Sequence, residues 1–238
     1  MPRESRALGG LLALRGEGGF GLLPQRRTRF ADQQRPCARA GRHDGCATHA
    51  LTPADVDEVA VFGTGLQARL QVEWLAELRQ LSRVRVCGRR PDAVRQLCAE
   101  LATAGLKAVP ATAEEAAGAP CVITATPSTS PLAPAEAFSA GVQHVTGIGT
   151  DLPGKAELPP GLFDRATTIA TDDHDQCLAH GDFGNAVRAG VVGAGADVSA
   201  GLVLRDGVPE RSGLTIADLT GVGVADAAVA TAVFTHLG

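Results

Sequence analysis

Residues 63 to 68 have the types and spacing of a turn that can hold a diphosphate. Gly63, Gly65 and Ala68 occupy the small positions of the pattern G-x-G-x-x-G/A. There the first glycine permits a tight turn, the second lets the backbone approach a phosphate, and the alanine keeps the next helix close to its strand. The sequence predicts a dinucleotide site here. A glycine turn that only connects a strand to a helix is the alternative. The predicted phosphate-binding residues are Gly63, Gly65, Leu66, Gln67 and Ala68.

Two arginines follow the next predicted strand, about 20 residues after the glycines. An acidic residue at that point would hydrogen-bond the ribose 2′-OH of NAD, but the stretch reads Cys87-Gly88-Arg89-Arg90. A guanidinium suits a 2′-phosphate instead. Arg89 and Arg90 therefore favour NADP, as NADPH, with NAD still possible. A solvated arginine pair is the alternative.

Further polar residues stand where two later strands are predicted to end. Thr126 and Ser128 follow one of them, and ligands of open α/β sheets bind at the carboxyl ends of strands. We expect these hydroxyls either to line the nicotinamide side or to cap turns.

The most reactive candidate group is Asp151, just beyond the strand that carries Gly147 and Ile148. Glycines here would let the backbone pass close to a flat ring. A carboxyl group beside that ring can give or take a proton as a hydride moves. Lys155 is predicted to contact the cofactor or substrate, or to pair with Asp151. A surface Asp–Lys pair without a catalytic role is the alternative.

Residues 172–175 read Asp-Asp-His-Asp and invite a metal interpretation. Neighbours in one short loop rarely converge on an ion without other ligands, so no metal site is predicted. Asp173 and Asp175 are expected to cap a helix. His180 and His236 are expected to be structural or exposed.

The elements that must position these residues alternate along the chain. Short apolar runs predict strands over 56–62, 84–87, 107–109, 121–125, 144–148 and 166–171. Helical patterns lie at 67–81, 91–104, 112–117, 134–138, 175–180 and 221–237. This order predicts an α/β fold with a doubly wound, Rossmann-type parallel sheet.

Composition limits the class of partner. The chain has 238 residues, a net charge of −4 and 45% hydrophobic residues, which fit a soluble protein without a basic face for nucleic acid. It contains no apolar run of membrane-spanning length. Six cysteines without a C-x-x-C pair indicate a reducing, cytoplasmic setting.

Residues 1–51 differ from the rest because they are rich in glycine and arginine and lack a helical or alternating period. We expect either a poorly packed leader or a remnant of a substrate-binding segment. The predicted division is an irregular leader over 1–51, a Rossmann domain over 52–205, and a C-terminal segment over 206–238 that packs toward a substrate and dimer domain.

Several of these segments together resemble the ornithine cyclodeaminase/mu-crystallin family. The most specific match is the run from Ile148 to Leu158, which includes Gly149-Thr150-Asp151 and Gly154-Lys155-Ala156-Glu157. Other matches are the glycine turn, the strand end at 124–128, residues 141–145, Asp175-Gln176-Cys177 with Gly181-Asp182-Phe183, and residues 214–221 with Asp226.

The resemblance implies a Rossmann domain with a second domain for substrate and dimer contacts, and residues 1–50 do not show that domain's usual pattern. It implies Asp151 as catalytic acid/base, Lys155 beside the cofactor, and a homodimer. It also implies an oxidoreductase that reduces a small imino acid with NADPH or oxidises an amino acid, and Arg89 matches the NADP-using branch. The alternatives are an ornithine cyclodeaminase, and a cofactor-binding protein with impaired catalysis.

Overall fold

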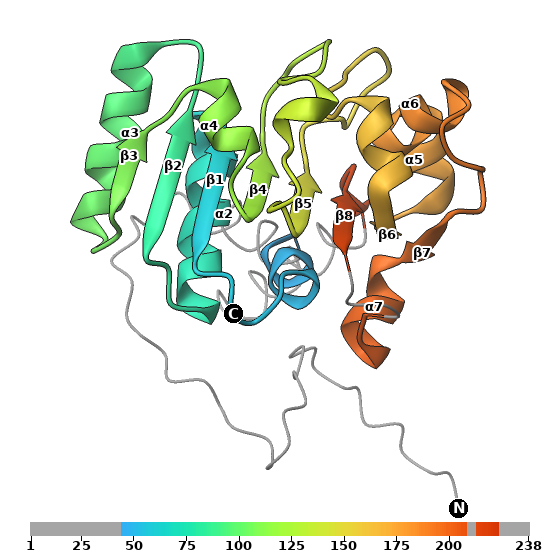
Figure 1. The fold of residues 1–238 in the computed structure, drawn as a ribbon, viewed down its shortest axis with the longest axis horizontal. Coiled ribbons are helices and arrows are strands. Elements are labelled where there is room, and N and C mark those ends of the chain that lie inside the picture. The colour runs from blue at the N-terminus through green and yellow to red at the C-terminus, as the bar shows by residue number, and fades with distance from the viewer. Residues whose placement is uncertain (1–43, 209–212, 224–238) are drawn as a thin grey trace, which may run out of the picture.

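The computed structural model describes residues 44–208 and 213–223, and these form one parallel sheet covered by helices on both faces (Figure 1). The strand order is β3-β2-β1-β4-β5-β8-β6-β7, and every pairing is parallel. The strands are β1 (Glu58–Phe62), β2 (Arg83–Cys87), β3 (Ala108–Pro110), β4 (Cys121–Thr124), β5 (His144–Gly147), β6 (Ala166–Thr171), β7 (Asp197–Ser199) and β8 (Leu214–Asp218). The predicted Rossmann-type sheet is confirmed.

The helices lie in the crossovers between these strands, except for the helix at 44–51, which precedes β1. They are a helix at 44–51, α2 (Leu66–Leu78), α3 (Pro91–Thr103), α4 (Ala113–Ala117), α5 (His174–His180), α6 (Asp182–Arg188) and α7 (Ala200–Asp206), with short 3-10 turns at Ala135–Ala137 and Pro160–Arg165. The residues at the N-termini of α3 and α4 explain why these two helices begin there. Pro91 opens α3, and Thr112 caps α4 through a reciprocal capping box with Glu115.

Alternate residues of each strand pack into different cores on the two faces of the sheet. Ala60 and Phe62 of β1 lie in one core, whereas Val59 and Val61 lie in the other. All four residues of β4 are buried because helices cover both faces of the sheet at this central strand. The sheet is therefore a rigid base for the loops at its carboxyl edge.

The helix at 44–51 was not predicted, because residues 1–51 show no helical or alternating period. Its Thr48 hydroxyl lies 2.9 Å from that of Thr146 in β5, and Thr215 of β8 donates to the Leu51 carbonyl at 3.1 Å. Ala47 and Leu51 are buried against β8 and α7 residues. Tertiary packing and these hydroxyl bonds form the helix, and neither is visible in a local period.

The strand β8 belongs to the segment 206–238, which was expected to pack toward a substrate and dimer domain, and it lies inside the sheet between β5 and β6. The division of the chain into three segments remains a prediction. The second described range ends at residue 223, so residues 224–237 of the helix expected over 221–237 lie outside the described residues, as do Asp226 and His236. Within the described ranges, no helix combines the length and apolar character needed to cross a membrane.

Candidate functional site

The glycine turn joins β1 to α2 at the carboxyl edge of the sheet. Gly63 has φ +119°, and a Cβ there would lie 2.5 Å from the Ala125 carbonyl oxygen, so both conformation and space require glycine. Ala68 is fully buried and faces the turn. The predicted roles of Gly63 and Ala68 in the fold of this motif therefore have a direct steric basis.

Gly65 is different, because it is exposed and a Cβ there would meet nothing within 4 Å. It is the N-cap of α2, and no side chain caps that helix end. Leu66 and Gln67, the first helical residues, are exposed beside it. The open backbone and uncapped helix N-terminus fit a diphosphate, which would lie where a side chain at residue 65 would otherwise project.

The turn after β2 packs directly against the glycine turn. A Cβ on Gly88 would lie 2.8 Å from Cγ2 of Thr64, so the two turns approach closely. Arg89 and Arg90 follow at once, both exposed, with Arg90 at the N-cap of α3. Both arginines are thus exposed next to the carboxyl end of β2, where the ribose of a bound dinucleotide would lie.

The hydroxyls of Thr126 and Ser128 are bonded within the protein. Thr126 Oγ1 donates to Glu157 at 2.7 Å, and Ser128 Oγ donates to the Ser130 carbonyl at 2.6 Å. This arrangement matches the turn-capping alternative for Ser128. It also reveals a residue to which the sequence analysis assigned no role, Glu157.

Glu157 is a buried glutamate that joins the loops after β4 and β5. Its Oε1 accepts hydrogen bonds from the backbone N–H and hydroxyl of Thr126, and its Oε2 accepts from Thr124 Oγ1 and the Gly149 N–H. Burial raises the pKa of this carboxyl, and the four donors oppose that effect. The only sequence signal was its place inside the Ile148–Leu158 run.

Two more buried carboxyls lie beneath the same edge. Asp182 accepts from the backbone N–H groups of Glu157 and Leu158, and Asp218 accepts from the Phe183 N–H at 2.8 Å. Burial, followed by the charge of Asp218, raises the pKa of Asp182 to about 8. Burial likewise raises the pKa of Asp218 to about 7. Such perturbed carboxyls are typical of functional edges of a sheet, but also of buried structural networks.

Asp151 and Lys155 form an ion pair on the loop after β5. The Asp151 side chain is 53% exposed, and Lys155 is 21% exposed. Gly147, at the end of β5, is buried against Leu158 and Thr124, and Ile148 follows with its N–H bonded to the Thr124 carbonyl at 3.0 Å. The pair therefore stands at the same edge as the glycine turn, open to solvent, as the sequence placed it.

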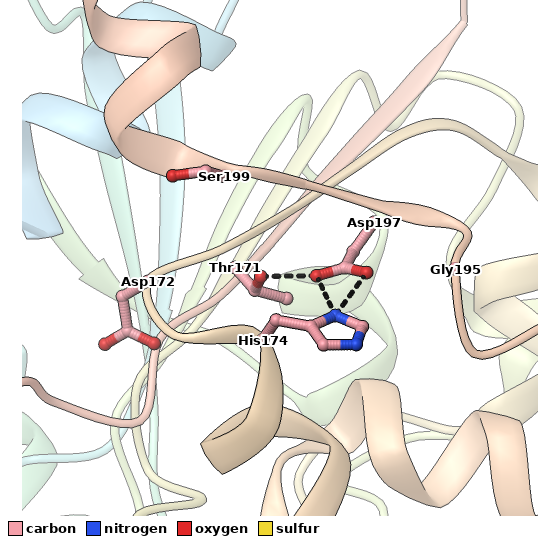
Figure 2. A pocket seen from close by; sticks show the side chains of 6 residues that line it. All are labelled: Thr171, Asp172, His174, Gly195, Asp197 and Ser199. Carbon is pink, nitrogen blue, oxygen red and sulfur yellow. Dashed lines mark hydrogen bonds and ion pairs between the residues drawn. The ribbon is translucent and has the colours of Figure 1, made fainter.

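A separate cavity of about 300 Å³ lies at the ends of β6 and β7, outside the predicted site (Figure 2). There Asp197 accepts a hydrogen bond from Thr171 Oγ1 at 2.6 Å and contacts His174 Nδ1 at 2.8 Å. Asp197 raises the pKa of His174, with smaller contributions from Asp175 and Asp173.

The acidic run at 172–175 has structural roles in the described chain. Asp173 caps α5 by accepting from the Gln176 N–H, as predicted, whereas Asp175 lies inside the first turn rather than at the cap. Asp172 accepts from the N–H groups of Thr220 and Gly221. Across residues 44–208 and 213–223, no group of three or more histidine, cysteine or acidic residues has the arrangement of a metal site.

Comparison with known proteins identifies chains of similar sequence. The model of the ornithine cyclodeaminase/mu-crystallin family matches residues 36–237. A protein of Rhizobium meliloti described as a dehydrogenase is 37% identical over 199 residues, which cover 79% of this chain and 59% of that protein. The alanine dehydrogenase of Archaeoglobus fulgidus is 32% identical over 202 residues, with 82% and 62% covered.

Solved structures share the fold described above. An archaeal alanine dehydrogenase dimer with bound NAD superposes with a TM-score of 0.78 at 30% identity, over 84% of this chain and 63% of that one. The iminosuccinate reductase of Paracoccus denitrificans, in complex with NAD⁺, gives a TM-score of 0.76 at 28% identity, with 83% and 62% covered. The chain thus spans about three fifths of the length of the relatives it matches.

Proposed function

Because the chain belongs to the ornithine cyclodeaminase/mu-crystallin family, we propose that it is an NAD(P)-dependent oxidoreductase that reduces a small imino acid, or oxidises the corresponding amino acid. The observation that carries this proposal is the open glycine turn at the N-terminus of α2, where Gly65 leaves room for a diphosphate. Similarity to NAD-binding dehydrogenases and reductases supports it.

The residues at the sheet edge would divide the work. Gly65, Leu66, Gln67 and Ala68 would offer backbone N–H groups to the diphosphate, whereas the Gly63 N–H donates to the Cys87 carbonyl at 2.9 Å, so Gly63 would shape the turn. Arg89 with Arg90 would hold the 2′-phosphate of NADPH. When bound, the nicotinamide group supplies or accepts the hydride at the carbon of a C=N or C–N bond. Thr126, Ser128, Gly147 and Ile148 would border the ring.

Asp151 would transfer the proton that accompanies the hydride. Its exposed carboxylate projects beyond β5, and the Lys155 ammonium beside it limits where that carboxylate points. Lys155 therefore serves as a partner of Asp151 and borders the cofactor. A homodimer, as in the archaeal relative, would complete the substrate side. The five described cysteines are free thiols, which supports a cytoplasmic setting.

The test of this proposal is a steric block at Gly65. The position has extended backbone, φ −87° and ψ −178°, and open space for a side chain, so Gly65→Val leaves the fold intact. The valine would occupy the diphosphate position, and we expect NADPH binding to fall by about 100-fold or more, which corresponds to about 3 kcal/mol. Gly193→Val, at another exposed glycine with open space, is the matched control.

Titration of NADPH fluorescence against each variant measures the effect. Equal NADPH affinity in Gly65→Val and the wild-type protein would overturn the proposal. The rival activity, ornithine cyclodeamination, is tested with ornithine and wild-type protein carrying its bound cofactor, because release of proline and ammonia without added NADPH would support a lyase. NADPH binding without turnover of any imino or amino acid would support the catalytically impaired alternative.

A further inference from the structure

One buried carboxylate bridges the loops after β4 and β5 where they leave the sheet, in addition to the backbone bonds from Ile148 to Thr124 and from Ala156 to Ser128, both 3.0 Å. Glu157 accepts four hydrogen bonds of 2.6–2.8 Å, three from Thr124 and Thr126 and one from the backbone of Gly149. Thr126 is the second residue of the loop that follows β4, and Gly149 stands two residues before Asp151. This buried group therefore helps to fix the spacing between Thr126 and Gly149 at the sheet edge.

Gly149 is shaped for this contact. A Cβ at this position would lie 2.2 Å from the Thr126 carbonyl oxygen and 2.5 Å from Cδ of Glu157. Neither neighbour can move freely, because one is backbone and the other is fully buried. The close approach of Gly149 to Thr126 thus depends on the absence of a side chain and on the carboxylate that bridges them.

The backbone of Glu157 is itself fixed on two sides. Its N–H donates to Asp182 of α6 at 3.1 Å, and its carbonyl accepts from the Leu132 N–H at 2.9 Å. The preceding residue, Ala156, donates to the Ser128 carbonyl at 3.0 Å. The carboxylate therefore reaches both loops from a segment that is anchored to a helix and to the first loop, as a rigid support requires.

From these contacts we propose that Glu157 is a positioning residue for hydride transfer. It does not touch the cofactor, but it holds the Thr126 and Gly149 backbones that border the nicotinamide ring and so sets the ring's place relative to Asp151. This inference rests on the proposed function, because it assigns the carboxyl edge of β4 and β5 to the nicotinamide. A misplacement of about 1 Å can reduce a reaction rate by about 100-fold, so such a support has a kinetic effect.

The experiment compares the affinity for 2′,5′-ADP, one part of the cofactor, with the affinity for the whole cofactor. Glu157→Gln retains the side-chain length but places an amide N–H₂ against the Gly149 N–H or the Thr124 and Thr126 donors. We expect it to bind 2′,5′-ADP, which lacks nicotinamide, within about twofold of wild type, because the glycine turn and Arg89 are untouched. NADPH affinity should fall by about tenfold, which corresponds to about 1.4 kcal/mol, and the emission of the bound dihydronicotinamide should change.

Two further variants keep the test decisive. Thr124→Val removes one of the four donors at nearly constant volume, so it should give a smaller change of the same kind even if Glu157→Gln folds poorly. Glu136→Gln, at an exposed glutamate, is the control and should match wild type.

The outcomes distinguish the two proposals. Failure of the wild-type protein to bind either NADPH or NADH would overturn the proposed function. If the wild-type protein binds NADPH, then identical NADPH affinity and emission in folded Glu157→Gln would overturn the positioning role, and so would equal loss of 2′,5′-ADP and NADPH.

Discussion

The Lys155 ammonium is ion-paired with the carboxylate of Asp151, four residues earlier on the loop that follows β5. Both groups belong to the one segment that the family resemblance and the strand pattern singled out independently. The pair joins a candidate proton carrier to a fixed positive charge at the edge of the sheet.

Replacing Asp151 by Asn should remove turnover while leaving cofactor binding nearly intact. The amide keeps the shape of the side chain but cannot carry the proton, and general acid–base groups contribute about 100- to 10,000-fold to rates. Single-turnover oxidation of NADPH with the imino acid that wild type accepts measures the effect. Asp164→Asn, at an exposed acid, is the control. Joint loss of turnover and NADPH binding would contradict the assigned role.

Arg89→Ala should weaken NADPH by about tenfold or more and change NADH by less than about twofold. A charge-assisted hydrogen bond to the 2′-phosphate contributes about 1.5–3 kcal/mol, and NADH lacks that phosphate. Fluorescence titration with both cofactors provides the comparison. Arg95→Ala, an exposed arginine paired with Asp92, should leave both affinities unchanged. Equal weakening of NADPH and NADH would refute the phosphate assignment.

The buried carboxyls predict that stability declines as the pH rises from about 6.5 to 8. The pKa of Asp182 is raised to about 8 and that of Asp218 to about 7, so the folded state binds protons that the unfolded state has released. Below pH 6.5, buried His144 has the opposite effect on stability. Burial lowers its pKa to about 3 in the folded state, so the unfolded state binds a proton that the folded state does not, and stability rises with pH there. The decline in stability is therefore clearest between pH 6.5 and 8.

Melting temperatures across that window measure this linkage. Each extra proton bound by the folded state corresponds to about 1.4 kcal/mol per pH unit, or roughly 3–6 °C for a chain of this size. Asp182→Asn removes one titrating group and should flatten the slope. A melting temperature that rises from pH 6.5 to 8 in the wild-type protein would show that these carboxyls titrate normally.

Arg79→Ala should destabilise the protein by about 2–3 kcal/mol. The Arg79 guanidinium donates to the carbonyls of Val56 at 2.9 Å and of Pro53 and Thr52 at 3.1 Å, and so ties the end of the 44–51 helix to the end of α2. Urea unfolding at constant pH provides the measurement. Arg83→Ala, whose only described ion pair is a 3.9 Å contact with Glu58, should cost less than about 0.5 kcal/mol.

Six of the eight described strands, β1 to β6, were predictable from sequence. The strand at Ala166–Thr171 was predicted to the residue, and β1 to β5 were predicted within two residues, because each is a buried apolar run bounded by glycine, proline or charged residues. The short elements α6, β7 and α7 were not resolved in a glycine- and alanine-rich stretch, where propensity is weak and tertiary packing decides. The 44–51 helix was missed for the same reason.

The chemistry of the site was predictable in part. The glycine turn and Asp151 are marked by local patterns, and the structure brings both to one edge. Glu157, Asp182 and Asp218 were visible only as members of matching segments, because several of their contacts in the fold join residues that are 25 to 68 positions apart. Bonds of that range leave no periodic signal in a sequence.

The position of β8 has a consequence for how the chain reaches its native state. Residues 214–218 form hydrogen bonds with both β5 and β6, so a nascent chain lacking them would carry two open strand edges in the middle of its sheet. Open edges recruit other chains. Protein synthesis therefore has to proceed past residue 218 before β8 can pair with β5 and β6. Until then, the unpaired edges of those two strands favour aggregation of the nascent chain over productive folding.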